Sequence, residues 1–251
     1  MPRLGGRKLF ALVKQRLPHD IAIGRDKFFS LLRDNQLLIK NRKNRPRTTN
    51  SNHNYRKYPN LVKDMVPSSS HQFWVSDITY ISTGEGFKYL SLITDVYSRK
   101  IIGWELAENL KAEHSIRALK RAIRQVPKGV RGIYHHSDRG VQYCCNEYVK
   151  TLKRNGFKIS MTESGDPRDN AYAERINGIL KVEWLYGINF KNLDHAKSCI
   201  SKVIYTYNNQ RPHMSIGLKT PQEVHSLNGN IPQLWKNYHL INYNNKKQIG
   251  L

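Results

Sequence analysis

The amino-acid sequence predicts an α/β protein in which helices flank a mixed five-stranded sheet, with a helical arm at the N-terminus. Five short segments between residues 73 and 161 are rich in β-branched and aromatic residues, as strands are. Segments with apolar residues at helical spacing separate and follow them. The resulting order, β-β-β-α-β-α-β-α, places helices over a mixed sheet.

Residues 1–39 are expected to form a basic, helix-turn-helix-like arm. Apolar residues recur at helical spacing from Leu9 to Leu17 and again from Phe28 to Leu38, with a break around 18–23. Residues 1–70 carry 16 Lys and Arg against 4 Asp, so the basic excess is concentrated here. Paired helices with this charge are candidates for DNA binding.

Residues 40–71 have the composition of a cationic linker. Seven Lys or Arg residues and no acid lie between Lys40 and Lys57, among many Asn, Thr and Ser. This segment is either an inert tether or a strand that follows DNA phosphates, and the two roles are compatible.

Residues 72–226 are predicted to form the α/β core, and residues 227–251 a C-terminal tail. Strands are expected at 73–81, 87–96 and 100–106, joined by short turns into an antiparallel meander, and then at 132–136 and 157–161. Helices are expected at 112–126, 146–152 and about 168–186, 192–208 and 220–227.

Composition narrows the class of protein. The 251 residues have a formal net charge of +23, which points to a polyanionic partner, most simply nucleic acid. No apolar stretch approaches the roughly 20 residues that span a bilayer, and the start lacks the apolar segment of a secretion signal. The three cysteines have no zinc-site spacing. We therefore expect no membrane partner and a cytoplasmic location.

Three acidic residues are the candidates for chemistry. Asp77 lies within the first strand, on the same face as Val75 and Thr79, whereas Asp138 follows the fourth strand and Glu174 lies early in a helix. A cluster of carboxylates needs cations, and oxygen ligands in a phosphate-binding protein suit Mg²⁺ or Mn²⁺. Two such ions can activate an oxygen on one side of a phosphorus and stabilise the leaving oxygen on the other.

Other polar residues were weighed for the same site. Asp95 is either a fourth acid or the cap of a turn, and the cap is favoured. His135 and His136 are expected to pack and hydrogen-bond at the strand end rather than act as bases. Cys144 is expected to be a small buried residue, and Trp74 a core residue.

Five motifs in order resemble one family. Trp74-x-x-Asp77-Ile-Thr-Tyr-Ile, His136-Ser-Asp138-x-Gly and Asp169-Asn170-Ala-x-Ala-Glu174 resemble the catalytic core of DDE transposases and retroviral integrases. Thirty-five residues lie between Asp138 and Glu174, the interval typical of that family. Tyr207-Asn208-x-x-Arg211-Pro212-His213 and Thr220-Pro221 resemble the C-terminal block of the bacterial insertion-sequence-three family.

The resemblance implies an RNase H-like fold in which Asp77, Asp138 and Glu174 are catalytic and bind two Mg²⁺ ions, for which Mn²⁺ can substitute. It implies cleavage at the ends of a transposon, followed by attack of the freed 3′-hydroxyl on another phosphodiester. Lys181 resembles a lysine that contacts transposon-end DNA. The residues expected to contact DNA are Lys181, Arg175, Arg42, Lys43, Arg45, Arg47 and Arg211.

The expected partners are double-stranded DNA, both transposon ends and target, and further copies of the chain assembled on it. Members of the family are often frameshift fusions, so we also expect an upstream-frame helix-turn-helix protein to contribute to end recognition. Two alternatives remain open at this point: an RNase H-like nuclease without joining activity, and an inactive DNA-binding relic of a mobile element.

Overall fold

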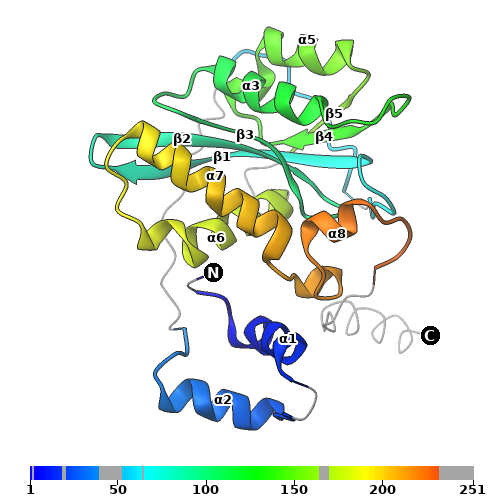
Figure 1. Cartoon of the computed structure of the whole chain (residues 1–251). Helices are drawn as coiled ribbons and strands as arrows, with labels where there is room; N and C mark the ends of the chain where they lie inside the picture. The colour runs from blue at the N-terminus through cyan, green and yellow to red at the C-terminus, as the bar shows by residue number, and fades with distance from the viewer. Residues whose placement is uncertain (2, 19–20, 40–52, 64, 164–169, 232–251) are drawn as a thin grey trace, which may run out of the picture.

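The computed structural model describes residues 1, 3–18, 21–39, 53–63, 65–163 and 170–231. Its centre is a five-stranded sheet in the order β3-β2-β1-β4-β5, with helices on both faces (Figure 1). The strands are β1 (Phe73–Thr83), β2 (Gly86–Asp95), β3 (Ile101–Ala107), β4 (Tyr134–Ser137) and β5 (Lys158–Met161). The predicted mixed five-stranded α/β fold is confirmed.

Strand register explains how residues far apart in sequence meet at the middle of the sheet. β1, β2 and β3 form the antiparallel meander, whereas β4 runs parallel to β1 and β5 parallel to β4. The β1–β4 pairing is short and ends at Val75 opposite His136. Extending that register by two residues sets Asp138 opposite Asp77, at the point where the two strands cease to pair.

One face of the sheet is covered by α3 (Ala112–Ile123) and α5 (Asn146–Arg154), together with the short α4 (Val141–Cys144). Strand alternation sends Trp74 and Ile93 to this face, where they pack with Leu119 and Tyr148. All four side chains are almost inaccessible to solvent, and Trp74 is the predicted core residue.

The opposite face is covered by α6 (Ala171–Glu183) and α7 (Leu193–Gln210), with α8 (Pro221–His225) at one end. Leu90 and Leu92 of β2 pack here against Ile176, Leu180 and residues of α7. Because α6 is anchored through this apolar core, its position relative to β1 is fixed, and that position decides where Glu174 lies.

The predicted arm consists of α1 (Gly6–Arg16) and α2 (Arg25–Asp34), which lie below the core in Figure 1. Phe10 and Phe28 pack the two helices together, with ring centroids 5.2 Å apart. Lys8 Nζ lies 3.1 Å from Glu183 Oε1 at the end of α6, which ties the arm to the core.

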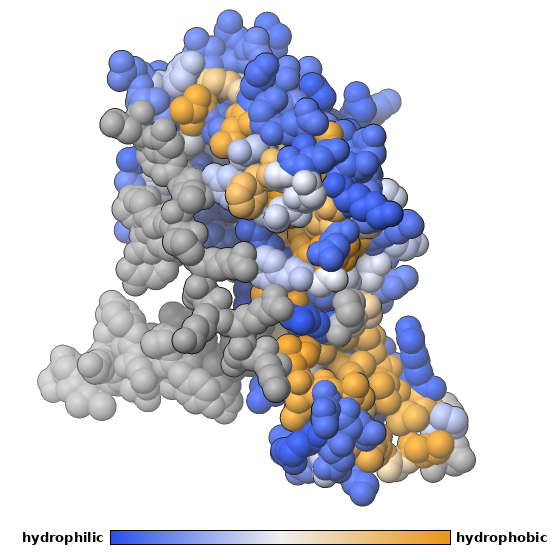
Figure 2. All heavy atoms as spheres, turned by 90° about the vertical axis from the view of Figure 1, so that its left-hand side faces the viewer, coloured by the Kyte–Doolittle hydropathy of each residue, from blue (hydrophilic) through white to orange (hydrophobic). Residues whose placement is uncertain are grey.

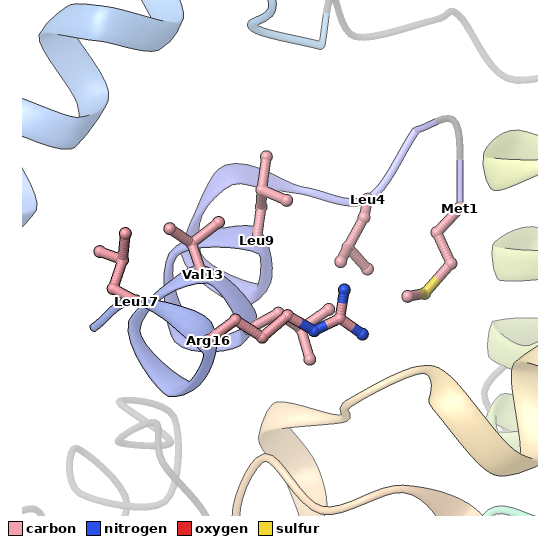
Figure 3. Close-up of a pocket in the computed structure, with 7 residues that line it drawn as sticks. Met1, Leu4, Leu9, Val13, Arg16 and Leu17 are labelled. Atoms are coloured by element: carbon pink, nitrogen blue, oxygen red, sulfur yellow. The ribbon is translucent and has the colours of Figure 1, made fainter. Parts of the chain in front are cut away.

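Apolar side chains remain on the surface of the arm. Figure 2 shows them gathered at its lower end, and Leu31 and Leu37 are among the exposed ones. A pocket of about 310 Å³ lies along α1, lined by Leu4, Leu9, Val13 and neighbouring side chains (Figure 3).

The core begins earlier than the predicted boundary at residue 72. Val62 is buried against Phe73 and Val75, and the backbone N–H of Leu61 donates to Ser160 Oγ at 2.9 Å. The segment around Val62 therefore packs on the core, because this apolar side chain among polar ones finds a partner there. The remainder of the predicted linker, 40–52, lies outside the described residues, as does most of the predicted tail.

Candidate active site

Asp77 is held at the centre of β1 by two hydrogen bonds. Its Oδ1 accepts from the backbone N–H of Ile78 at 2.9 Å, and its Oδ2 accepts from Asn177 Nδ2 at 2.6 Å. Burial raises the pKa of Asp77 to about 7, and the negative charges of Asp138 and Glu174 act in the same direction. The side chain lies at a place where three carboxylates act on one another.

Asp138 stands at the end of β4, in a turn that leaves little room for a side chain at Gly140. The backbone N–H of Gly140 donates to Asp138 Oδ1 at 3.0 Å. A Cβ on Gly140 would lie 3.0 Å from that same oxygen, which is too close for an ordinary contact. The turn thus fixes a partly exposed carboxylate beside Asp77, whose pKa responds to it more than to any other charge.

Glu174 lies in the first turn of α6 and is exposed to solvent. The predicted core face of this helix, Ala173, Ile176 and Leu180, is buried, so Glu174 points away from the apolar core. Asn170 stands at the N-cap of α6, but its side chain makes no capping bond and instead donates to the backbone oxygen of Ser76 at 3.2 Å. That bond ties the start of α6 directly to the residue before Asp77.

The donor set suits a hard divalent cation. Asp138 and Glu174, which lie on two other elements, both act electrostatically on Asp77, and burial together with these two charges raises the pKa of Asp77. Among the described residues, no three His, Cys, Asp or Glu side chains lie close enough together to hold an ion as they stand.

Asn177 is the member of the site that the sequence analysis missed. It lies one helical turn after Glu174, is buried, and joins α6 to Asp77. One feature of the sequence could have identified it: Asn177 is a polar residue between Ile176 and Ile179, two buried apolar positions of the same helix. A buried amide at such a position needs a partner, and here that partner is the carboxylate.

The predicted DNA-contacting residues fall into three groups. Arg175 is exposed and Lys181 partly exposed on α6, with open space around Gly178 between them. Arg42, Lys43, Arg45 and Arg47 lie outside the described residues. Arg211 is only 1% exposed and its guanidinium is bound to Glu183, so the prediction that it contacts DNA is wrong: a buried, ion-paired arginine presents no donor to a phosphate.

The residues set aside in the sequence analysis have structural roles. Asp95 is buried and caps a turn by accepting from the backbone and hydroxyl of Ser98, as predicted. His135 Nε2 lies 2.7 Å from Ser76 Oγ, and burial lowers the pKa of this histidine to about 3. His136 bonds to Ser160 at the strand end.

Cys144 is likewise a poor nucleophile. The residue is buried, and burial raises the pKa of its thiol to about 11, so the thiol stays protonated at neutral pH. No residue of the described helices is part of a segment long and apolar enough to cross a bilayer.

A sheet in this order, with acids in the central strand, at the end of β4 and on the helix after β5, is the RNase H-like arrangement of integrase and transposase catalytic cores. Two family models, both described as integrase core domain, match residues 67–167 and 155–221. An uncharacterized 31 kDa protein of insertion element IS600 from Shigella sonnei is 40% identical over 204 residues, covering 80% of this chain and 74% of that protein. The chain belongs to the IS3 family of insertion-sequence DDE transposases.

Further comparisons agree with this assignment. Transposase InsF of insertion sequence IS3A from Escherichia coli K12 is 34% identical over 169 residues, which span 67% of this chain but 58% of InsF. The fold is that of the HTLV-2 integrase catalytic core in complex with magnesium (TM-score 0.51, 20% identity, 64% of this chain and 99% of that one). A simian T-cell lymphotropic virus intasome chain gives a TM-score of 0.56 at 17% identity, over 93% of this chain and 75% of that one.

Proposed function

We propose that the protein cleaves transposon-end DNA and joins the freed 3′-hydroxyl to a second DNA by transesterification, using Asp77, Asp138 and Glu174. The proposal is supported by the strand register, which, when extended by two residues, sets Asp138 opposite Asp77. The pKa of Asp77 supports it too: burial raises that pKa most, and the charges of Asp138 and Glu174 raise it further. Acids in such an arrangement are stable when ionised only if cations join them.

The three carboxylates would hold two Mg²⁺ ions, with Mn²⁺ as a substitute. The ions, when bound, would activate the attacking oxygen and stabilise the leaving oxygen of the phosphodiester. The protein itself orients the carboxylates of Asp77 and Asp138 by hydrogen bonds. Asn177 and the N–H of Ile78 each donate to one oxygen of Asp77, and the N–H of Gly140 donates to Asp138. Both oxygens of Asp77 thus keep a fixed direction.

The DNA would pass along the exposed face of α6. Glu174, Gly178 and Lys181 lie on one stripe of the helix, since seven residues at 100° each return almost to the same direction. Gly178 has nothing within 4 Å of a built Cβ, so a DNA backbone can approach there. Arg175 and Lys181 would bind its phosphates, together with Arg42, Lys43, Arg45 and Arg47.

Double-stranded DNA, both transposon ends and target, is the proposed substrate, and a multimer assembled on paired ends the proposed active form. The solved intasome, which has this fold, supports the second point. An upstream-frame helix-turn-helix protein or fusion would supply the remaining end recognition, and the protein would work at the nucleoid in the cytoplasm.

A joining assay with pre-cut transposon ends tests the proposal. We expect strand-transfer products in Mg²⁺ or Mn²⁺ and none in EDTA. Asp77→Asn, Asp138→Asn and Glu174→Gln should each abolish joining, whereas Glu147→Gln, an exposed acid on α5, should not. Full joining by the Asp138→Asn variant would refute the assigned chemistry.

The same assay separates the two alternatives. Products limited to hydrolysis would indicate an RNase H-like nuclease without joining activity. DNA binding with neither reaction, in the intact fusion as well as in this chain, would indicate an inactive relic. The presence of all three acids in the sequence, with Asp138 and Glu174 both acting electrostatically on Asp77, favours the transposase.

A further inference from the structure

The surface formed by α3, α5 and the turns that follow them is strongly basic. Two stretches of sequence, 114–137 and 148–162, include most of both helices and the turns after them. Together they hold ten Lys or Arg residues and no Asp or Glu, and all ten cations are exposed. Cations gathered on one surface repel one another, and the phosphates of a nucleic acid relieve that repulsion. The surface therefore favours a polyanionic partner.

A hollow of about 380 Å³ lies between the C-terminal ends of the two helices. The residues that line it come from the last turns and C-caps of both helices: Lys120, Ile123, Arg124, Thr151, Arg154 and Asn155. Ile123 packs against the core, and Asn155 Nδ2 donates to the backbone oxygen of Thr151 at 2.8 Å. The lining thus combines ordered side chains with three cations.

The three cations of the hollow differ from their basic neighbours in having no acidic partner. Lys120, Arg124 and Arg154 form no ion pair within the described part of the chain. Arg121, by contrast, binds Glu105 of β3, with 2.7 Å between Nη1 and Oε2. An arginine held in this way serves the fold, whereas the three cations of the hollow remain available to an external anion.

Stabilisation of the helix ends does not account for so many cations. The C-terminal end of a helix is equivalent to about half a negative charge, so the two ends together offset about one of the three cations. About two positive charges stay in excess at the hollow. Lys128 and Arg131 in the turn after α3 and Lys150 on α5, all exposed, add to this excess. The local charge is therefore larger than the helices need.

The hollow lies away from the acid site. α6, which carries Glu174, covers the opposite face of the sheet (Figure 1). Asp138 follows the last residue of β4, whereas α3 and α5 lead into the turns before β4 and β5, where the N–H of Gly132 donates to the carbonyl of Gly156 at 3.0 Å. A straight duplex along the exposed face of α6 would therefore not reach the hollow.

We propose that the α3–α5 surface, defined by Lys120, Arg124 and Arg154, binds the phosphate backbone of a second stretch of duplex DNA, separate from the one at the acids. The inference rests on the proposed function, because it takes the polyanion to be the DNA on which the acids work. Contacts between cations and phosphates hold and position a duplex without reading its sequence. One copy of the chain would thus bind DNA at two places.

The first test is a triple variant with Lys120→Gln, Arg124→Gln and Arg154→Gln in the full chain. Each phosphate contact contributes about 0.9 to the slope of log affinity against log salt, so the slope should fall by about 2.7. A rise from 50 to 200 mM salt should then cost the variant about 40-fold less affinity than it costs the parent protein. Fluorescence anisotropy with nonspecific duplex DNA measures both. The melting temperature should not fall, because the variant breaks no ion pair and relieves repulsion.

A second triple variant removes the same charge elsewhere and serves as the control. It carries Lys191→Gln, Lys202→Gln and Lys219→Gln, three exposed lysines before α7, on α7 and before α8. Its salt slope should change by less than about one, the contribution of a single phosphate contact. Equal weakening of DNA binding by the two triple variants would assign the effect to net charge alone and would overturn the inference.

Lysine acetylation read by mass spectrometry gives a second measurement on the unaltered protein. Duplex DNA should protect Lys120 and Lys150 from acetylation and leave the reactivity of Lys202 unchanged. Acetylation of Lys120 that is the same with and without DNA would overturn the inference.

The outcomes for the inference and for the proposed function are separable. Parental salt dependence in the first triple variant, with joining of pre-cut ends intact in the parent protein, would overturn the inference and leave the proposed function standing. A changed mass of that variant in light scattering without DNA, with parental DNA binding, would assign the surface to contacts between copies and also overturn the inference. If the parent protein neither joins ends nor binds duplex DNA, both fall.

Discussion

Glu183 and Arg211 form a buried two-point ion pair that holds the C-terminal end of α6. Arg211 Nε donates to Glu183 Oε2 at 2.7 Å, and Nη2 donates to Oε1 at 2.6 Å. Burial alone would raise the pKa of Glu183, but the hydrogen bonds and charge of Arg211 hold it below its usual value. The pair joins the helix that carries Glu174 to the segment after α7, and Lys8 of the arm adds a third charge.

Breaking this pair should destabilise the protein strongly. Arg211→Met leaves a carboxylate buried in the core, and removal of one partner of a buried pair costs about 3–5 kcal/mol. Urea unfolding measures the loss. Glu183→Leu combined with Arg211→Met should recover much of it, because the buried carboxylate is gone and only the partly exposed Lys8 remains charged there.

A matched control is Arg25→Ala, which removes the exposed pair with Asp26 and should leave the urea midpoint unchanged. Equal midpoints for Arg211→Met and Arg25→Ala would show that the buried pair does not hold α6.

Loss of the Asn177 amide should weaken metal binding more than it weakens the fold. Asn177→Leu keeps the volume but removes the donor to Asp77 Oδ2, which raises the pKa of Asp77 further and frees its carboxylate to turn. Affinity for Mn²⁺, measured by calorimetry, should fall about 10–100-fold. Asn209→Leu is the control, since that exposed amide bonds only within its own helix. Parental affinity in Asn177→Leu would contradict the positioning role.

Buried neutral histidines should make the protein acid-sensitive. The pKa of His135 is lowered to about 3 by burial, with the charge of His136 adding to it, whereas in the unfolded chain it returns to about 6.5. Between these values the unfolded state binds more protons, so stability falls as the pH drops from about 6.5 towards 3. His225, whose pKa is also lowered to about 3 by burial, acts in the same direction.

The urea midpoint should therefore be lower at pH 5 than at pH 7.5. His135→Gln removes one titrating group, so its loss between the two pH values should be smaller than that of the parent protein. An equal loss would mean that His135 is not responsible.

Gly178 and Gly103 should respond to alanine in opposite ways. Gly178 is in a helix with open space around it, so Gly178→Ala should stabilise the protein by about 0.5–1 kcal/mol. A Cβ on Gly103 would lie 2.3 Å from the backbone oxygen of Ala118, so Gly103→Ala should destabilise by at least about 1–3 kcal/mol. Thermal unfolding measures both.

The bulkier Gly178→Leu tests the DNA path. If DNA runs over this face of α6, the variant should stay folded and bind transposon-end DNA more weakly in fluorescence anisotropy. Undiminished binding would place the DNA elsewhere.

DNA binding should depend steeply on salt. A protein that neutralises 6–10 phosphates loses about 10³–10⁵ in affinity between 50 and 200 mM salt, because counterions are released on binding. We expect a fall of about a thousandfold for nonspecific duplex DNA. Deletion of residues 1–39 should flatten the dependence while Mn²⁺ binding is kept. A deletion reaching residue 70 would remove Val62 from the core and confound the result.

The helices and strands were largely predictable because their patterns are local. The 3.6-residue spacing along α6 correctly gave its buried face, whereas Phe73, Trp74 and Val75 show that β1 is buried on both faces. The short α4 was missed, since four residues carry too little periodicity. The boundary of the core was also misplaced, because a few apolar residues in a polar stretch, such as Val62, do not show locally what they pack against.

The candidate site also has a part that the sequence predicted and a part that it did not. The sequence identified Asp77, Asp138 and Glu174 by residue type, by their position on predicted elements and by resemblance. The pairing register of β1 and β4, extended by two residues, then explains why Asp77 and Asp138 lie opposite each other. Arg211 could not be assigned from the sequence. A basic residue near the end of a helix was predicted to contact DNA, whereas its burial depends on the position of Glu183 in the folded chain.

The sequence by itself determined the order of elements, the basic character, the three acids and the family. Only the tertiary structure decided that Asn177 donates a hydrogen bond to Asp77 and that Arg211 forms a buried ion pair with Glu183. It also decided that Lys8 joins the arm to α6. The reason is physical: periodicity and charge are properties of neighbouring residues along the chain, whereas a contact across elements depends on how every intervening segment packs.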